Sequence, residues 1–176
     1  MHQLIESDPD VELTWRAFEL RPEPVPMIDP NSDYLRRAWS DSVAPLAERL
    51  GVTMRFPPVK PRTRLAHEAA HWARAQGRFE DYHNEIFRAF FERGEDIGDV
   101  DVLMALAHGL GLDRDSLRQA LTSHDFAASV LADEGEAARL GVSGVPAFVA
   151  NRKAALSGVQ PVENLRKLIE SVRGAG

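Results

Sequence analysis

Cysteine is absent from the sequence. Without a thiol, these 176 residues cannot form a disulfide, bind zinc through sulfur or supply a cysteine nucleophile. Long apolar runs are absent too, and none approaches the roughly 18 residues that a membrane-spanning helix needs. The first residues show no basic stretch followed by an apolar run, which a signal peptide would need. These absences favour a cytoplasmic protein without a membrane partner.

Positive charge is also in deficit, because the net charge is −6 at pH 7. An acidic balance argues against a nucleic-acid-binding surface. With 44% hydrophobic and 27% charged residues, the chain has the composition of an ordinary globular protein. Its length suits one domain, or one domain with a sizeable insertion. No feature of the sequence calls for a cofactor.

The most informative stretch lies between residues 141 and 161. A predicted helix ends at Gly141, and the loop Val142 to Val145 runs into Pro146. Apolar residues then predict two strands joined by Asn151-Arg152, and Gly158-Val-Gln-Pro161 leads into a last helix. The predicted strands are Ala147 to Ala150 and Lys153 to Ser157. Proline cannot donate to a β-ladder but is tolerated at the mouth of a strand, and a Val-Pro bond in a tight turn suits a cis peptide.

Gly141-Val-x-Gly-Val-Pro-x-Phe-Val, together with Ser157-Gly-Val-Gln-Pro161, resembles the DsbA-like thioredoxin family and its FrnE-like branch. The resemblance implies that Pro146 is the family's cis-proline. It further implies that Gly144, Val145 and Pro146 form a substrate-binding loop, in which the backbone of Val145 pairs with an extended thiol or peptide substrate. A strand-entry proline in an unrelated α/β domain is the alternative interpretation of this stretch.

The start of the chain carries a second resemblance. Apolar and polar residues alternate from Val11 to Phe18, which predicts a half-buried strand. Trp15-Arg-x-Phe-Glu-Leu-Arg-Pro22 resembles the family's strand that follows its first helix. In the family, a central strand and that first helix, with Cys-x-x-Cys at its start, come before this point. The resemblance therefore implies that about 25–35 residues of the family pattern, including the redox pair, are missing from this chain.

The middle of the chain is predicted to be helical. Apolar spacing, caps and glycine stops predict helices over Tyr34–Leu50 with a kink at Pro45, Arg64–Ala75 capped by Thr63, Phe79–Arg93, Val100–Leu110, Ser116–Leu121, Phe126–Leu140 and Val162–Val172. Three further motifs resemble the helical insertion of the same family: Thr63-Arg-Leu-Ala-His67, Ala75-Gln-Gly-x-Phe79 and Phe90-Phe-Glu-x-Gly-x-Asp-Ile97. The expected fold is an α/β thioredoxin-like fold with an inserted helical subdomain, lacking the first strand and most of the first helix. We assign residues 1–26 and 126–176 to the thioredoxin-like halves and 32–125 to the insertion.

One motif points to different chemistry. His67-Glu68-x-x-His71 places two histidines one turn apart on a predicted helix, as in zinc peptidases. A zinc site would need a third ligand, for which Glu85, Glu92 and Glu95 are candidates without a signature. We favour a surface pair of histidines and predict no metal site. We also expect the large aromatic residues of the middle region to pack the helical subdomain rather than to line a substrate groove; they are Trp39, Trp72, Phe87, Phe90 and Phe91.

The resemblance implies a DsbA/FrnE-like thiol–disulfide oxidoreductase that acts on a protein or a small thiol or disulfide. The redox segment and every catalytic residue would lie outside this chain. One alternative is an enzyme like the glutathione-dependent 2-hydroxychromene-2-carboxylate isomerases, with glutathione as partner. Another is a non-catalytic thioredoxin-fold binding module, in which a second copy of the chain covers an exposed sheet edge in a homodimer.

Overall fold

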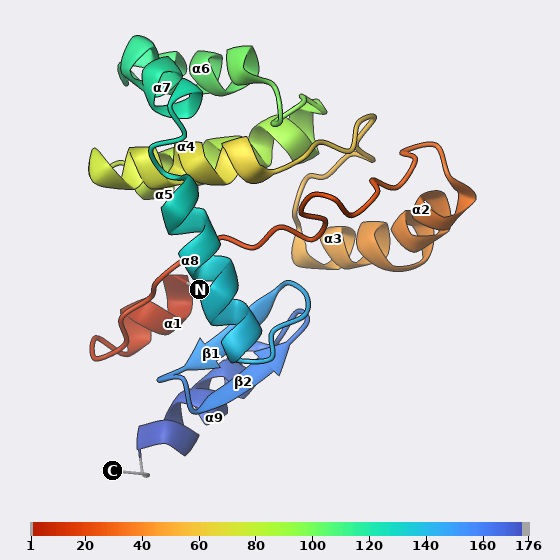
Figure 1. Ribbon diagram of the computed structural model, residues 1–176. Coiled ribbons are helices and arrows are strands. Elements are labelled where there is room, and N and C mark those ends of the chain that lie inside the picture. Colours follow the sequence, from red (N-terminus) through yellow and green to blue (C-terminus); the bar gives the residue numbers. More distant parts are fainter. Residues whose placement is uncertain (1, 174–176) are drawn as a thin grey trace. The chain divides into compact units, whose positions relative to one another are not determined.

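The computed structural model describes residues 2–173 and divides them between two compact units. The smaller unit consists of the residues up to Leu20 and those from Leu131 onward, and the larger unit is Arg21–Val130. Helix α8 (Ala127–Arg139) contains the boundary between them (Figure 1). Within the described residues, no helix combines the length and the apolar character needed to cross a membrane.

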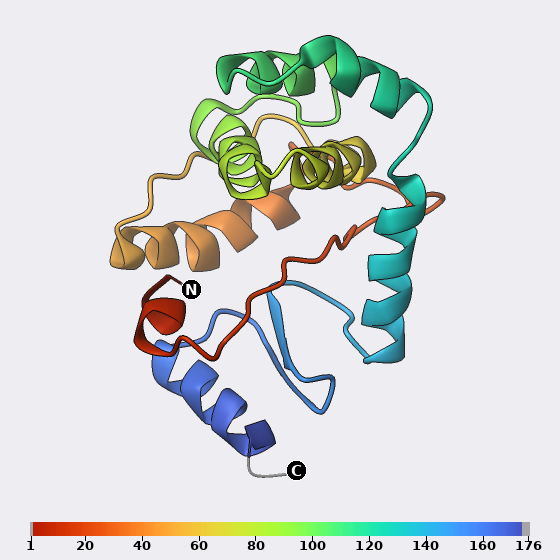
Figure 2. The same ribbon diagram turned by 90° about the vertical axis from the view of Figure 1, so that its left-hand side faces the viewer.

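Helices build the larger unit, and their packing makes its core. They are α2 (Asp33–Ala38), the π-helical turn η1 (Trp39–Val43), α3 (Ala44–Leu50), α4 (Arg64–Ala75), α5 (Phe79–Arg88), the π-helical turn η2 (Ala89–Arg93), α6 (Val100–Gly109) and α7 (Arg114–Thr122). Figures 1 and 2 both show α6 and α7 lying over the pair α4 and α5. Small residues on α4, among them the fully buried Ala69 and Ala73, let these helices approach closely. Tyr82 is also fully buried, and its hydroxyl donates to the Leu103 carbonyl at 2.7 Å.

The predicted kink at Pro45 takes the form of a π-helical turn. Because Pro45 has no N–H and its ring crowds the preceding turn, a regular α-helix cannot pass through it. The chain widens to η1 just before this residue, where the N–H of Ala44 donates to the Trp39 carbonyl. Ser32 caps the start of α2 by accepting a hydrogen bond from the Leu35 N–H at 3.4 Å. The single helix expected here is therefore three consecutive helical segments.

Two other helix predictions need correction. The helix expected over residues 79–93 changes to a π-helical turn, η2, before it ends at Gly94, whose φ of 72° is left-handed. Thr63 precedes α4 but makes no side-chain capping bond. Its backbone has φ −99° and ψ 0°, outside the extended conformation in which a capping side chain reaches back to the helix. The bounds predicted for α4 are those observed.

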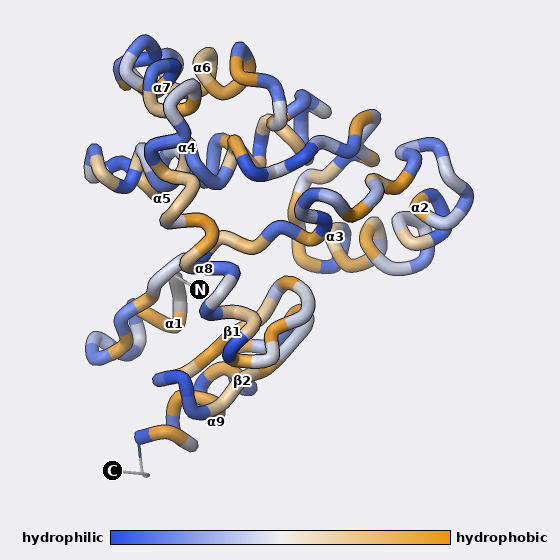
Figure 3. Tube along the Cα trace, viewed as in Figure 1, coloured by the Kyte–Doolittle hydropathy of each residue, from blue (hydrophilic) through white to orange (hydrophobic). Residues whose placement is uncertain are grey.

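The smaller unit holds a two-stranded antiparallel sheet. Strand β1 (Ala147–Ala150) pairs with β2 (Ala154–Ser157), with Phe148 opposite Leu156. Apolar residues dominate both strands (Figure 3), and helix α9 (Val162–Arg173) packs against them. The Lys153 N–H donates to the Ala150 carbonyl at 2.9 Å. This bond closes a turn with positive φ at Asn151 and Arg152, so β2 begins one residue later than predicted.

The strand expected over residues 11–18 is not formed. Helix α1 (His2–Ser7) is followed by a segment that joins no ladder, and β1 and β2 are the only strands among residues 2–173. Burial follows the expected alternation at Val11, Leu13 and Ala17, but Trp15 lies exposed. A strand requires hydrogen bonds to a neighbour, so alternation alone does not produce one.

Candidate functional site

The loop from Val142 to Pro146 joins α8 to β1, and its start is fixed by the end of the helix. Gly141 has a left-handed φ of 71°. The Gly141 N–H donates to the Ala138 carbonyl and the Val142 N–H to the Ala137 carbonyl, at 3.1 and 2.9 Å. This pair of bonds is a Schellman motif, which satisfies the last carbonyls of a helix. The glycine therefore turns the chain sharply out of α8 and into the loop.

The three residues predicted to bind substrate form the end of this loop. Gly144 is half-buried, whereas Val145 is 49% exposed and Pro146 is exposed. The Val145–Pro146 peptide bond is cis. The Pro146 carbonyl accepts a hydrogen bond from the Gly158 N–H at 2.8 Å, one residue beyond the ladder. The structure thus presents Val145 at the surface, separated from β1 by Pro146 alone.

The backbone of the exposed residue Val145 has no hydrogen-bond partner among the described residues. Within residues 2–173, neither its N–H nor its carbonyl forms a hydrogen bond. Strand β1 pairs with β2 along one edge and, in the described part of the chain, with no strand along the other. Unpaired backbone groups at a sheet edge are a template for another extended segment. Val145 and β1 together therefore offer a short edge that can accept one.

A second segment lies beside the loop. The two are joined by the hydrogen bond from the Gly158 N–H to the Pro146 carbonyl. This segment, Gly158–Pro161, is held by Gln160, whose side chain donates to the Ser157 carbonyl at 2.6 Å. The Asn164 side chain in α9 donates in turn to the Gln160 side chain at 3.0 Å. Val159 is exposed on this segment, as Val149 is on β1. Exposed apolar side chains therefore lie on the segment beside the loop and on β1.

Ion pairs connect the hairpin turn to α8. Glu136 accepts from Arg139 at 2.7 Å on its own helix and also from Arg152 in the turn between β1 and β2. The hydrogen bond from Arg139 and the charge of Arg152 hold the pKa of the Glu136 carboxyl below its ordinary value. The hairpin is therefore tied at its turn to α8 and at its other end to the loop.

The extended segment after α1 is held by α8 as well. Asp133 is only 3% exposed and accepts from the Ala17 N–H and from the Arg16 guanidinium, both at 2.9 Å. The Glu19 N–H donates to Glu134 at 3.3 Å. Side chains of α8 thus take the place that a neighbouring strand would have beside these residues. Sequence inspection did not single out Asp133, because one aspartate on a helix carries no signal of burial.

The His67-Glu68-x-x-His71 motif lies on α4, and its glutamate is buried. Glu68 is 1% exposed, and its Oε1 lies 3.3 Å from Nδ1 of His124. The candidate third ligands Glu85 and Glu95 pair with Arg93 instead. Across the described residues, no three His, Asp or Glu side chains are placed to hold a metal ion. The other oxygen of Glu68 is buried and has no hydrogen-bond partner in the part of the chain that the structure describes.

Trp72 and Phe87, two of the aromatic residues of the larger unit, have different surroundings. Trp72 is buried in the core, with its ring edge-on to Tyr82 at 6.3 Å. Phe87, in contrast, is 50% exposed and belongs to a line of rings along one face of α5 and η2. Neighbouring rings in this line are 4.8 to 6.0 Å apart between centroids, and its members are Phe79, His83, Phe87 and Phe91. Trp72 therefore packs inside the helical region as expected, whereas Phe87 does not.

His83 stands between two phenylalanine rings, and this position changes its acidity. Desolvation is the main cause that lowers the pKa of His83 to about 4, and the charges of His67 and Arg74 add to the effect. The sequence analysis assigned His83 no role. Its spacing of four residues from both Phe79 and Phe87 is the signal that would have placed it in this line.

Comparison with known proteins bears on the fold and the family. The model of a family described as "DSBA-like thioredoxin domain" matches residues 1–170. The uncharacterized protein YwbO of Bacillus subtilis (strain 168) is 42% identical over 120 residues, which cover 66% of this chain and 60% of that protein. The chain therefore matches less than two thirds of the length of this relative.

A solved structure adds to this comparison. The crystal structure of a probable DsbA oxidoreductase from Streptomyces coelicolor aligns with a TM-score of 0.81 and 27% identity, over 98% of this chain and 81% of that chain. The structural likeness covers both the helical region and the small sheet. The chain therefore has a DsbA-like thioredoxin fold and belongs to the family of DSBA-like thioredoxin domains.

Proposed function

We propose that this chain is the substrate-binding part of a DsbA/FrnE-like thiol–disulfide oxidoreductase. In this proposal, an extended segment of a protein, or a small thiol or disulfide, lies along Gly144, Val145 and Pro146. The observation that carries the proposal is that Val145 is an exposed residue whose backbone N–H and carbonyl have no hydrogen-bond partner within residues 2–173, one residue before β1. The family and the probable DsbA oxidoreductase of similar structure support it.

The geometry suits recognition through the main chain. An extended segment that adds to a sheet edge gains affinity from backbone hydrogen bonds, while side-chain contacts set its specificity. The N–H and carbonyl of Val145 supply one donor and one acceptor. The exposed side chains of Val149 and Val159 supply apolar contacts on the neighbouring elements. Such a surface accepts varied sequences, which a general disulfide-exchanging protein requires.

The redox step itself needs a thiol that these residues do not contain, since the chain has no cysteine. In thiol–disulfide exchange, a thiolate attacks one sulfur of a disulfide. A new S–S bond forms, and the old one breaks with its electron pair on the departing sulfur. The contribution of this chain is to hold the substrate extended and to fix its position. Among the family's branches, the motifs around Gly141 and Trp15 favour the FrnE-like one.

The absence of cysteine also makes a direct test simple. Val145→Cys creates a chain with one thiol, placed where the substrate would lie. The probe is a short unstructured peptide whose central cysteine is blocked as a mixed disulfide with thionitrobenzoate, so that each exchange releases a coloured anion. A minimal reagent, N-acetylcysteine amide blocked as the same mixed disulfide with thionitrobenzoate, reports the intrinsic reactivity of the introduced thiol. The matched control is Val52→Cys, because Val52 is 51% exposed against 49% for Val145.

For each variant, the rate with the peptide is divided by the rate with the minimal reagent. We expect this ratio to be about tenfold or more higher for Val145→Cys than for Val52→Cys, because binding raises the effective concentration of the disulfide. An excess of the same peptide with serine in place of cysteine should slow only Val145→Cys. Equal ratios in the two variants would overturn the proposal. A rate enhancement seen only with the glutathione–thionitrobenzoate disulfide would also overturn it and favour the glutathione-dependent alternative.

A further inference from the structure

A groove on the larger unit combines an apolar floor with the guanidinium of Arg36, which pairs with no carboxylate of the described residues. It encloses about 490 Å³ and is lined by Pro30, Asn31, Arg36, Trp39, Phe56 and Pro58. Its residues come from the turn before α2, from α2 and η1, and from the segment that follows α3. None of them belongs to the loop from Val142 to Pro146, so the groove is a separate feature of the chain.

Both walls of the groove are held by contacts of their own. On one side, the Asp29 carboxylate accepts from the Asn31 N–H at 2.8 Å, which fixes the turn before α2. On the other side, the Arg55 N–H donates to the Phe91 carbonyl at 2.7 Å, and Pro57 is fully buried. The groove is therefore formed before any ligand arrives, which reduces the cost of binding.

The floor is aromatic. The rings of Trp39 and Phe56 meet edge to face, with centroids 5.5 Å apart and an interplanar angle of 85°. Pro30 and Pro58 add two more apolar rings to the lining. Ligand sites of this size are typically lined by such groups, with a few polar atoms that fix orientation. The groove thus offers an apolar body a place to stack.

The polar groups of the lining are mainly donors. Arg36 uses its Nε–H to donate to the Asn31 carbonyl at 3.3 Å, which leaves the four N–H groups on its two Nη atoms. Within the described residues, no carboxylate pairs with Arg36, and the indole N–H of Trp39 has no acceptor. Among the residues that the structure describes, no Asp or Glu lines the groove. A guanidinium fork without a partner matches the two oxygens of a carboxylate.

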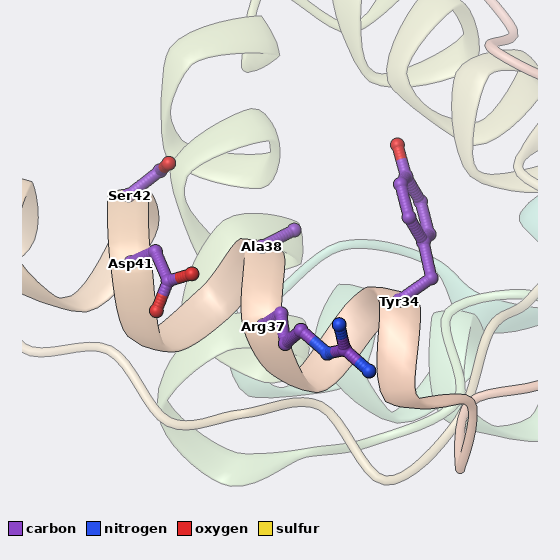
Figure 4. Close-up of a pocket in the computed structure, with 5 residues that line it drawn as sticks. All are labelled: Tyr34, Arg37, Ala38, Asp41 and Ser42. Atoms are coloured by element: carbon purple, nitrogen blue, oxygen red, sulfur yellow. The ribbon is translucent and has the colours of Figure 1, made fainter.

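A neighbouring pocket shows what distinguishes this groove. That pocket is lined by Tyr34, Arg37, Ala38, Asp41 and Ser42, all from the single helical run of α2 and η1 (Figure 4). It carries Asp41 as well as Arg37, so its charges balance, and no second segment faces it. Arg37 is therefore a matched control for Arg36: it is the same residue type, one position further along the same helix, and also exposed.

We propose that the groove binds a small carboxylate with an aromatic body. The carboxylate pairs with the Nη groups of Arg36, and the aromatic ring packs on Trp39 and Phe56. The indole N–H of Trp39 is a further donor to the ligand. The neutral amide of such a molecule would leave Arg36 without its counter-charge and bind more weakly.

The test uses the full chain labelled with ¹⁵N and titrated with 4-phenylbutyrate. The chain has three tryptophans, so three indole N–H signals are observed, and Trp39→Phe identifies the signal of interest. We expect 4-phenylbutyrate to shift that signal saturably. The affinity for 4-phenylbutyramide, measured in the same way, should be about tenfold weaker. Arg36→Gln should weaken binding by about tenfold or more, whereas Arg37→Gln should change it less than about twofold.

Two outcomes overturn the proposal. In one, the Trp39 signal stays in place up to the solubility limit of 4-phenylbutyrate, so that the groove binds no such acid. In the other, the amide binds as well as the acid, so that the groove is apolar without selecting a carboxylate. The comparison of acid with amide uses the unchanged protein and does not depend on how any variant folds.

Discussion

The carboxylate of Asp133 accepts a hydrogen bond from the backbone N–H of Ala17 at 2.9 Å, across 116 positions of the sequence. The same carboxylate accepts from Arg16, and it is almost completely buried. A backbone N–H in an extended segment normally pairs with a strand. Here a helix side chain takes that role and fixes residues 16 and 17 in the smaller unit.

Asp133→Ala should therefore destabilise the protein by about 2–4 kcal/mol, since it leaves the buried Ala17 N–H without an acceptor and Arg16 without its partner. Urea unfolding followed by circular dichroism measures this loss. Asp125→Asn is the control, because Asp125 is exposed and lies just before the same helix; we expect a change within about 0.5 kcal/mol. A loss for Asp133→Ala no larger than that of the control would contradict the role of this bond.

Two glycines in left-handed conformations make a matched pair. Gly94 has φ 72° and Gly51 has φ 66°. A Cβ added at Gly94 would lie 3.0 Å from Cδ of Pro58, whereas a Cβ at Gly51 would meet no atom within 4 Å. We expect Gly51→Ala to cost about 1–2 kcal/mol from the backbone alone, and Gly94→Ala to cost at least about 1 kcal/mol more. Equal losses of unfolding free energy for the two variants, measured in urea, would show that Pro58 moves aside at no energetic cost.

His83 should make stability depend on pH. Its pKa is lowered from 6.5 to about 4 in the folded state, chiefly by desolvation, so the unfolded chain binds more protons between these values. Stability from this group is therefore complete above about pH 6.5 and is lost as the pH falls towards 4. With allowance for partial exposure, the loss should be about 2–3 kcal/mol.

The measurement is the free energy of unfolding at several pH values within this window. His83→Phe keeps a ring between Phe79 and Phe87 but cannot titrate, so its loss of stability on acidification should be smaller than that of the unchanged protein by about 2–3 kcal/mol. His108→Gln, at an exposed position, is the control for the loss of a histidine as such. If His83→Phe and the unchanged protein lose the same stability, another group causes the acid sensitivity.

Sequence pattern predicted those elements whose local signals agree with their packing. The bounds of α4 and β1 were predicted as observed, because apolar spacing, Gly77, Pro146 and the Asn151-Arg152 turn all mark the same ends. Residues 11–18 show where such signals fail. They alternate like a strand, but a strand also needs a neighbour, and alternation does not reveal whether one is present.

The candidate site was predicted as a stretch of sequence, not as a set of contacts. The position of Pro146 at the mouth of a strand follows from local rules about proline. The support given by Asp133 and Glu136 could not be predicted, because each depends on residues brought together by the tertiary fold. The burial of Glu68 was missed for the same reason: its neighbours on α4 indicate a helix, but the pairing with His124 spans 56 positions.

The central claim, that an extended substrate pairs with the backbone at Val145, is tested most directly by amide hydrogen exchange. In the ¹⁵N-labelled full chain, we expect a saturating unstructured peptide to shift the Val145 N–H signal and to slow its exchange by about tenfold or more, because that N–H gains an acceptor. The N–H of Val52, which donates to the Ala47 carbonyl at 2.9 Å, should exchange at the same rate with and without the peptide. A Val145 N–H that exchanges at the same rate with and without bound peptide would contradict the account.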